Sequence, residues 1–233
     1  MEIQYYRNLN SDPASLKRAE ELVERARAID SQLPAVHTAM GALAANHYDY
    51  RRAADEFLEA TRLDPDEALA WDFRSWALAY EVPPDAVEAE KASREAIRLG
   101  FNRMGAYYHL GRTLYLQGRY DEAVEAMEYA RKLSPESSTP DLGLAQVYLA
   151  KGEYDRSLTY WLRQPEKVRD TAIGAFWGGS IYAARGEKEK ALLEMQVALD
   201  KGFRDFAAIE ASTAFASLRS DPRFQNLLTR YRQ

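Results

Sequence analysis

Cysteine is absent from the 233-residue chain, and histidine is scarce. Without cysteine the chain can form no disulfide, no thiolate metal site and no cysteine nucleophile. The 3 histidines are His37, His47 and His109, and no two of them lie three or four residues apart, which excludes a helical metal-binding motif by spacing. We therefore expect no metal site and no cofactor.

Long apolar runs are also missing. No uninterrupted stretch reaches the roughly 18 apolar residues that suggest a membrane-spanning helix. Met1 to Asn10 contains no basic segment followed by an apolar core, which is the pattern of a secretory signal. We therefore expect a soluble chain with no membrane contact of its own. The expected compartment is the cytoplasm, or the periplasm if the chain belongs to a membrane-anchored regulator.

Charge of one sign does not dominate either. The chain has 31 Lys and Arg against 36 Asp and Glu, and the net charge of -5 argues against binding to a phosphate backbone. Nucleic acid is therefore not an expected partner. The carboxylates alternate with basic residues in segments of helical spacing, where they favour solvated helix faces, and no pair stands out as a general acid and base. The sequence predicts a protein that is not an enzyme.

The second half of the chain contains a repeat with a long period. Gly118, Gly152 and Gly186 are each separated by 34 residues, and Met127 and Trp161 keep the same step. A period of this length exceeds one helix face or one strand, so it indicates a supersecondary unit that is used several times. Stacked units of this kind form extended surfaces, which favour binding over catalysis.

Residues 107–135 show what one unit contains. Apolar residues recur at helical spacing from Tyr107 to Tyr115, and the pattern breaks at residues 117–119. A second periodic run follows from Ala123 to Leu133 and ends at Pro135, because proline cannot continue a helix. The pattern predicts two helices packed as a hairpin.

This unit resembles the tetratricopeptide repeat. The resemblance rests on Tyr107, Leu110, Gly111, Leu114, Gly118, Tyr120, Ala123, Met127, Ala130 and Pro135. Gly41, Ala53, Phe57, Ala60 and Pro65 hold the matching roles earlier in the chain. The resemblance implies an all-α fold, a right-handed α-solenoid (superhelix) of stacked helical hairpins.

The resemblance extends over nearly the whole chain and implies a single solenoid domain, residues 1–233. The predicted repeats are 34–67, 68–103, 104–137, 138–171 and 172–205, after a degenerate or partial repeat at 1–33 and before a C-terminal capping segment at 206–233. Asp221 and Pro222 form a helix start, and Phe224 opens an apolar stripe on the expected capping helix. Such a cap keeps the last repeat of an open stack from facing water.

Four residues depart from the pattern. The prolines at 83 and 84 predict a longer turn between the helices of the second repeat. Ser93 stands where the family prefers a large side chain, which leaves the packing of that repeat open. Pro165 is expected to end the second helix of the fourth repeat early.

The first helices of such repeats line the concave face, so their outward positions predict a groove for a partner. The predicted groove residues are Phe73, Trp76, Tyr80, Tyr108, His109, Arg112, Tyr115, Phe176 and Trp177. Aromatic side chains with an arginine among them are the composition of an interaction hot spot. The alternative is that these aromatics are packing residues that bury one another.

One subset of the family binds C-terminal carboxylates through Lys and Asn on successive first helices. The matching positions hold Ala35, Ala39, Leu69, Phe73, Gly105 and His109. This carboxylate clamp is therefore absent. The groove favours an apolar or aromatic segment of a protein or peptide, which could come from the same polypeptide or from a second copy.

Two hypotheses of function follow. The first is a non-catalytic protein–protein interaction scaffold that binds a peptide or protein segment in the aromatic-lined groove. The alternative is a regulatory, sensor or self-association region of a larger bacterial signalling protein, because residues 5–30 and 220–224 resemble the repeat regions of bacterial multidomain kinases, cyclases and transcription regulators. Association into a homodimer is compatible with both.

Overall fold

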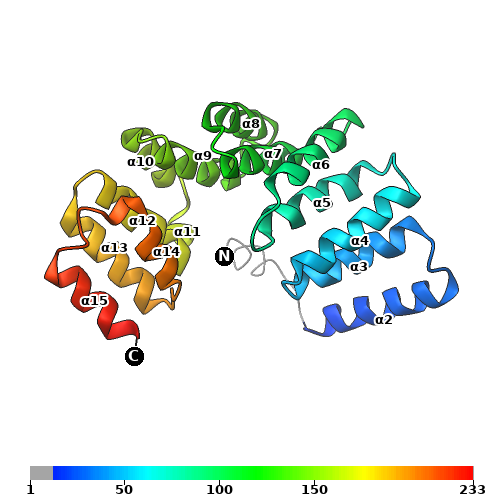
Figure 1. The fold of residues 1–233 in the computed structure, drawn as a ribbon, viewed down its shortest axis with the longest axis horizontal. Helices are drawn as coiled ribbons and strands as arrows, with labels where there is room; N and C mark the ends of the chain where they lie inside the picture. Colours follow the sequence, from blue (N-terminus) through cyan, green and yellow to red (C-terminus); the bar gives the residue numbers. More distant parts are fainter. Residues whose placement is uncertain (1–12, 233) are drawn as a thin grey trace. The chain divides into compact units, whose positions relative to one another are not determined.

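The computed structural model describes residues 13–232, and this part of the chain is built from α-helices and one short 3-10 helix, without a strand (Figure 1). The predicted all-α fold is confirmed. Residues 1–12, with which the predicted partial repeat begins, lie outside the described residues. The second helix of that repeat is α2, Pro13–Ile29.

Five helical hairpins follow α2. They consist of α3 (Pro34–Asn46) with α4 (Tyr50–Leu63), α5 (Ala68–Tyr80) with α6 (Ala86–Arg98), α7 (Met104–Leu116) with α8 (Tyr120–Leu133), α9 (Thr139–Ala150) with α10 (Tyr154–Leu162), and α12 (Ala172–Ala184) with α13 (Lys188–Asp200). The short helix α11 (Glu166–Arg169) stands between α10 and α12. The C-terminal segment contains α14 (Phe206–Ala211), the 3-10 helix η1 (Thr213–Phe215) and α15 (Pro222–Arg232).

The turns within the hairpins explain the glycine period. Gly118, Gly152 and Gly186 follow the first helices with φ of 74°, 78° and 79°. Glycine adopts this left-handed conformation without a Cβ clash, so the chain can reverse within three residues. In the hairpin of α3 and α4 the same backbone conformation occurs at Tyr48, with φ 63°.

Aspartates fix the starts of several other helices. The Asp49 side chain accepts a hydrogen bond from the backbone N–H of Arg52 at 3.1 Å, and Asp85 accepts one from Glu88 at 3.1 Å. These bonds satisfy N–H groups that have no partner inside the helix. Asp85 ends the connection of residues 81–85, which is longer than the three-residue turn at 117–119, as the two prolines predicted.

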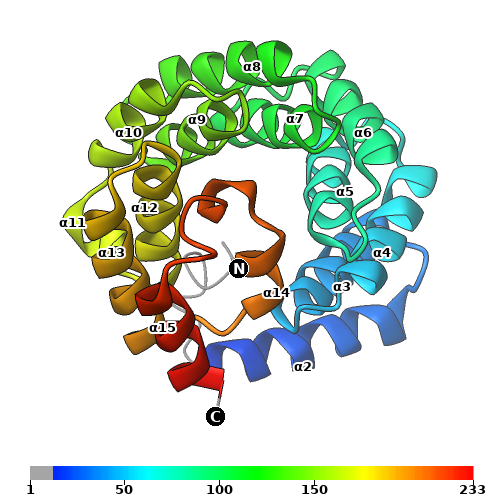
Figure 2. The same cartoon turned by 60° about the vertical axis from the view of Figure 1, so that its left-hand side comes forward.

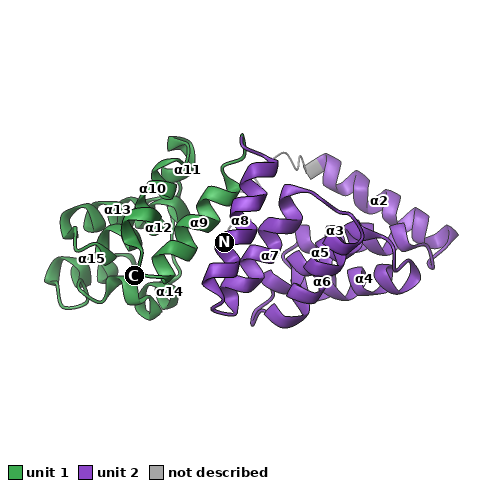
Figure 3. Cartoon of the chain, turned by 90° about the horizontal axis from the view of Figure 1, so that it is seen from above, with its two compact units in different colours: residues 1, 136–233 green, residues 2–135 purple. Residues whose placement is uncertain are grey.

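The chain divides into two compact units (Figure 3). Of the described residues, 13–135 belong to unit 2 and 136–232 to unit 1. The division falls close to the predicted boundary between the third and fourth repeats, at 137. The assignment of all repeats to one solenoid domain stays a prediction.

Unit 2 arranges its hairpins in two layers, with α3, α5 and α7 side by side in one and α4, α6 and α8 in the other (Figure 2). Close approach of the layers needs small residues. A Cβ on Gly41 would lie 2.6 Å from the Phe57 ring, and one on Gly111 would lie 2.6 Å from Cγ of Met127. The helices therefore interlock through a glycine facing a large side chain.

Ser93 is fully buried in this unit, where the family prefers a large side chain. Its hydroxyl hydrogen-bonds the hydroxyl of Ser75 on α5, which is also fully buried, and donates to the carbonyl of Ala89 at 3.1 Å. The missing apolar volume is thus replaced by a satisfied polar contact between α5 and α6.

Unit 1 is organised around two clusters of large side chains. The Trp161 indole of α10 fits against α12, where a Cβ on Gly178 would lie 2.5 Å from the ring. The indole N–H also donates to the carbonyl of Gly174 at 3.2 Å. The helix α10 ends at Leu162, before Pro165, so Trp161 lies in its last turn. The second cluster contains the C-terminal segment.

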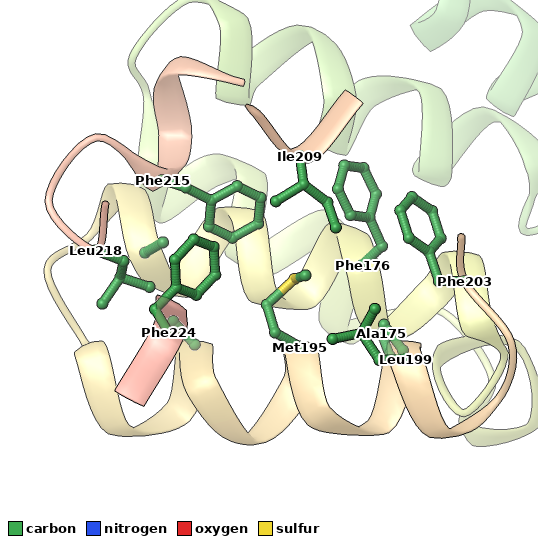
Figure 4. Close-up of a cluster of buried hydrophobic side chains, with 12 residues drawn as sticks. Ala175, Phe176, Met195, Leu199, Phe203, Ile209, Phe215, Leu218 and Phe224 are labelled. Atoms are coloured by element: carbon green, nitrogen blue, oxygen red, sulfur yellow. The ribbon is translucent and has the colours of Figure 1, made fainter. Parts of the chain in front are cut away.

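The C-terminal segment packs on α12 and α13 (Figure 4). Phe215 and Leu218 are fully buried, and the Phe215 ring stacks on that of Phe224 with their centroids 5.5 Å apart. The Ser217 hydroxyl donates to the carbonyl of Ala183 on α12 at 3.3 Å. The last hairpin is therefore covered by η1 and the residues after it as well as by α15.

Candidate interaction surface

The predicted groove residues divide between the two units. Phe73, Trp76 and Tyr80 lie on α5, and Tyr108, His109, Arg112 and Tyr115 lie on α7, so these belong to unit 2. Phe176 and Trp177 lie on α12 in unit 1. The two sets are described separately below.

Three aromatic side chains meet where α4 approaches α5. The Trp76 ring lies 5.9 Å from the Tyr50 ring in an edge-on arrangement, and Tyr80 lies 6.0 Å from Tyr50 and 6.2 Å from Trp76. All three are partly buried, so each ring packs with one side and leaves part of its surface open. Edge-on and tilted pairs at these distances are favourable because of the ring quadrupole.

Arg112 extends this group from α7. Its Cζ lies 4.1 Å from the centre of the Tyr80 ring, which is a cation–π contact between neighbouring first helices. We call Tyr50, Trp76, Tyr80 and Arg112 the Trp76 cluster. It combines the three residue types that are enriched at interaction hot spots, and all four side chains remain partly accessible.

Burial also changes the chemistry of Tyr50. Removal from water disfavours the charged phenolate, and nearby Tyr48 adds to the effect, so the pKa of Tyr50 rises to about 12. The side chain therefore stays a neutral aromatic surface at physiological pH. Its hydroxyl is buried and has no hydrogen-bond partner among the described residues.

His109 is largely enclosed by side chains of α5 and α7. Its Nδ1 lies 3.0 Å from Oδ1 of Asp72 on α5, and the two side chains are only 14% and 5% exposed. The Tyr108 ring is 5.9 Å from the imidazole and is itself 2% exposed. This group joins α5 to α7, and Tyr108 and His109 offer little surface to a partner.

Phe73 and Tyr115 are predicted groove residues that do not belong to the Trp76 cluster. Phe73 packs into the core of unit 2, with its ring 5.5 Å from that of Phe57. Tyr115 lies 6.0 Å from Tyr120 of α8 and is partly buried. Of the predicted residues of unit 2, Tyr108 is buried, and the other six are partly buried.

In unit 1 the chain itself covers the predicted positions. Phe176 is 6% exposed, stacks on Phe203 at 4.4 Å and lies 6.0 Å from Phe215. Trp177 is partly buried against the same core. The C-terminal segment thus occupies the face of α12 that carries Phe176. A use of Phe176 and Trp177 in partner binding stays a prediction.

Sequence reasoning missed Tyr50 because it considered only first helices. Tyr50 opens a second helix, yet its ring contacts two residues of the next first helix. A signal was present, since Tyr120 and Tyr154 occupy the corresponding position of later repeats, at the start of α8 and α10. An aromatic at this position can reach across to the following hairpin.

Arg74 was also missed, and it lies on the side of α5 that faces α6. Its guanidinium lies 3.7 Å from the Glu88 carboxylate and 5.8 Å from the centre of the Trp71 ring. Burial lowers the pKa of Arg74, while Glu88 and neighbouring carboxylates act in the opposite direction. The arginine therefore has its counter-ions within unit 2.

The described residues hold no group of three or more His, Asp or Glu placed to bind a metal. A search of the same residues finds no helix with the length and apolar character required to cross a bilayer.

The arrangement of successive paired helices, three of which share a glycine turn at the same position, defines a helical-repeat protein. Sequence models described as "Tetratricopeptide repeat" match residues 85–138 and 114–175. The two matches identify residues 85–175 as tetratricopeptide repeats. Repeats of this family typically bind protein partners and are non-catalytic, so the fold is that of a protein–protein interaction scaffold.

Known proteins resemble the chain at low identity. Small glutamine-rich tetratricopeptide repeat-containing protein 2 of Saccharomyces cerevisiae is 29% identical over 133 residues, which are 57% of this chain and 37% of that protein. Anaphase-promoting complex subunit 3 of Schizosaccharomyces pombe is 21% identical over 65% of this chain and 23% of its own length. The chain therefore spans roughly a third or less of these curated relatives.

Solved structures share the fold. PilW, described as a widely conserved type IV pilus biogenesis factor, has a TM-score of 0.69 and 17% identity, with 93% of this chain and 94% of PilW covered. YrrB, described as a TPR protein with an unusual peptide-binding site, has a TM-score of 0.55 and 21% identity, covering 81% of this chain and 96% of YrrB. At these identities the similarity defines the fold and leaves the partner open.

Proposed function

We propose that the chain is a non-catalytic scaffold that binds an apolar or aromatic peptide segment on the face formed by α5 and α7. The contact is centred on the Trp76 cluster. One observation carries the proposal: the Arg112 guanidinium lies 4.1 Å over Tyr80, beside Trp76, and all three side chains remain partly accessible on neighbouring first helices.

The geometry suits a segment with an apolar or aromatic side chain. The packed rings of Trp76 and Tyr80 already have few conformations. Little side-chain entropy is therefore lost when a partner covers these two rings. Leu69, at the start of α5, is 37% exposed and extends the apolar surface along the same helix. The lysine and asparagine of the carboxylate clamp are absent from the matching positions, so recognition would depend on side chains rather than on a chain end.

The proposal is tested by selecting peptides from a displayed random library on the full chain. A selected peptide is then synthesised and titrated calorimetrically. We expect Trp76→Ala to weaken its binding at least tenfold, because truncation of a central aromatic in an interface typically costs about 2 kcal/mol or more. Arg112→Ala should also weaken binding, by a smaller factor.

Tyr129→Ala is the matched control. Tyr129 is an aromatic of similar size on the second helix α8 and is 40% exposed, so its loss should leave the affinity unchanged. Circular dichroism of each variant tests whether the fold is retained. Peptides that bind Trp76→Ala as tightly as the unchanged chain would remove this face from the proposed function.

The alternative function, a regulatory or self-association region in a larger signalling protein, stays a proposal that rests on the sequence alone. Light scattering over a concentration range tests the self-association part. A mass that rises from one chain to two would support it, and a constant mass of one chain would contradict it. Trp76→Ala in the same measurement shows whether the two activities share a surface.

A further inference from the structure

A cavity of about 490 Å³ lies in unit 1, between α14 and α15. It is formed by residues outside the predicted repeats and is separate from the Trp76 cluster. Its apolar lining includes Ile209 of α14 and Phe224 and Leu228 of α15. The volume is within the range of roughly 300–1,000 Å³ that is typical of sites for small molecules.

The floor of the cavity is formed by side chains of the core. Ile209 and Phe224 are 1% and 3% exposed and belong to the core cluster drawn in Figure 4. Leu228 packs on the same cluster while remaining partly accessible. A ligand that entered would therefore contact side chains whose positions the core has already set, which limits the entropy lost on binding.

An arginine at the edge of the cavity is fixed in place. Nη2 of Arg219 donates to the carbonyls of Glu210 at 2.9 Å and Ser212 at 3.1 Å. The carbonyl of Arg219 in turn accepts a hydrogen bond from the Gln225 side chain on α15, at 2.9 Å. These contacts hold the guanidinium at the edge of the apolar floor, and they use neutral acceptors only.

The charges around the cavity do not balance. Glu210 forms an ion pair with Arg232, so the acidic side chain that lines the cavity already has a cationic partner. Across residues 13–232, Arg219 has no carboxylate partner. The cavity thus combines an apolar floor with one positive charge that lacks a counter-ion in the described structure.

We propose that this cavity binds a small molecule made of an apolar body and a single carboxylate, such as a medium-chain fatty acid. The hydrocarbon part would lie on Ile209, Phe224 and Leu228, and the carboxylate would pair with the Arg219 guanidinium. Arginine suits this role because its planar fork of N–H donors matches the two oxygens of a carboxylate. This site would operate independently of peptide binding in unit 2.

The test uses octanoate as the probe and octan-1-ol as its uncharged analogue. The full chain is labelled at the methyl groups of Ile and Leu, and the shifts of Ile209 and Leu228 are followed by NMR during each titration. We expect octanoate to shift both methyl signals saturably and to bind at least tenfold more tightly than octan-1-ol. The reason is that a charge-assisted hydrogen bond contributes more than a neutral one.

Arg219→Gln separates the ionic contact from the apolar one. It keeps an amide donor for the carbonyls of Glu210 and Ser212 but removes the charge, so octanoate affinity should fall at least tenfold while octan-1-ol affinity stays the same. Arg219→Lys keeps the charge and should retain part of the preference for octanoate. Arg230→Gln removes an exposed positive charge of α15 that does not line the cavity, and it should change neither affinity.

Leu228→Trp tests the cavity itself, because the larger side chain should fill it and abolish the binding of both probes. Equal affinities for octanoate and octan-1-ol in the unchanged chain would overturn the proposal. It would also be overturned if Arg219→Gln bound octanoate with the same affinity as the unchanged chain. A third contrary result would be saturable shifts that occur only at methyl groups distant from Ile209 and Leu228.

Discussion

Single residues at the hairpin turns carry a left-handed backbone, and three of them are glycines. Tyr48 has the same conformation, with φ 63°, although its side chain gives it a Cβ. The left-handed conformation costs an L-residue roughly 1–2 kcal/mol relative to the right-handed one. The Tyr48 ring is 41% exposed and lies 6.5 Å from the Tyr50 ring, so its contacts offset only part of this cost.

We expect Tyr48→Gly to raise the free energy of unfolding by about 0.5 kcal/mol. Removal of Cβ relieves the strained backbone of the folded chain, and the greater freedom of glycine in the unfolded chain offsets only part of this gain. Gly118→Ala is the reciprocal change. Nothing lies within 4 Å of a Cβ at Gly118, so its expected loss of about 1 kcal/mol would come from the backbone alone. Urea unfolding followed by circular dichroism measures both.

The two substitutions together distinguish backbone strain from side-chain packing. A Gly118→Ala variant as stable as the unchanged chain would contradict the assigned cost of the left-handed turn. A Tyr48→Gly variant destabilised by more than about 1 kcal/mol would instead show that the ring packs more strongly than a partly exposed side chain should.

At the scale of elements, the C-terminal segment shows where sequence reasoning reached its limit. The helix of Pro222–Arg232 could be predicted, because Asp221 and Pro222 form a helix start and Phe224 begins an apolar stripe. The position of residues 206–220 on α12 could not. They lie outside the repeat, so no period relates Phe215 to Phe176, and only tertiary packing brings their rings to 6.0 Å.

Phe215 should anchor this segment. It is fully buried, and its ring contacts both Phe176 and Phe224. We expect Phe215→Ala to lower the free energy of unfolding of unit 1 by about 3–5 kcal/mol, through lost burial and the cavity that remains. Thermal and urea unfolding of the full chain, followed by circular dichroism, measure the effect.

Leu193→Ala is the control for this prediction. Leu193 lies on α13, the helix beneath the same cluster, but is 65% exposed, so its truncation should change stability by less than about 0.5 kcal/mol. If the two variants were equally stable, the C-terminal segment would not be packed as the structure describes.

At the scale of the whole molecule, the period of 34 made the hairpins predictable because each one satisfies its own local pattern. Gly41 and Gly111 face the large side chains of Phe57 and Met127 within single hairpins, and the repeat pattern pairs them. Three of the four residues of the Trp76 cluster were among the predicted groove residues, and Tyr50 was not. Tyr50 joins it across a boundary between repeats, and the repeat pattern does not specify which side chains meet there.

Because packing contacts are mostly between neighbouring helices, a destabilising substitution should affect mainly the helices next to it. Helices contact the helices beside them in the sequence or in the next hairpin, as α4 contacts α5 and α10 contacts α12. The stability of such a chain is approximately a sum over repeats and their nearest neighbours. Loss of the Phe215 anchor should therefore act on α12 and α13 and leave the hairpin of α5 and α6 unaffected.

Hydrogen exchange followed by mass spectrometry tests this prediction in the full chain. With Phe215→Ala, peptides from α12 and α13 should exchange faster than in the unchanged chain, because these helices open more often when the core beneath the C-terminal segment is weakened. Peptides from α5 and α6 should keep their rates. If those peptides accelerated by the same factor, the chain would open as one cooperative body, and nearest-neighbour packing would not describe its stability.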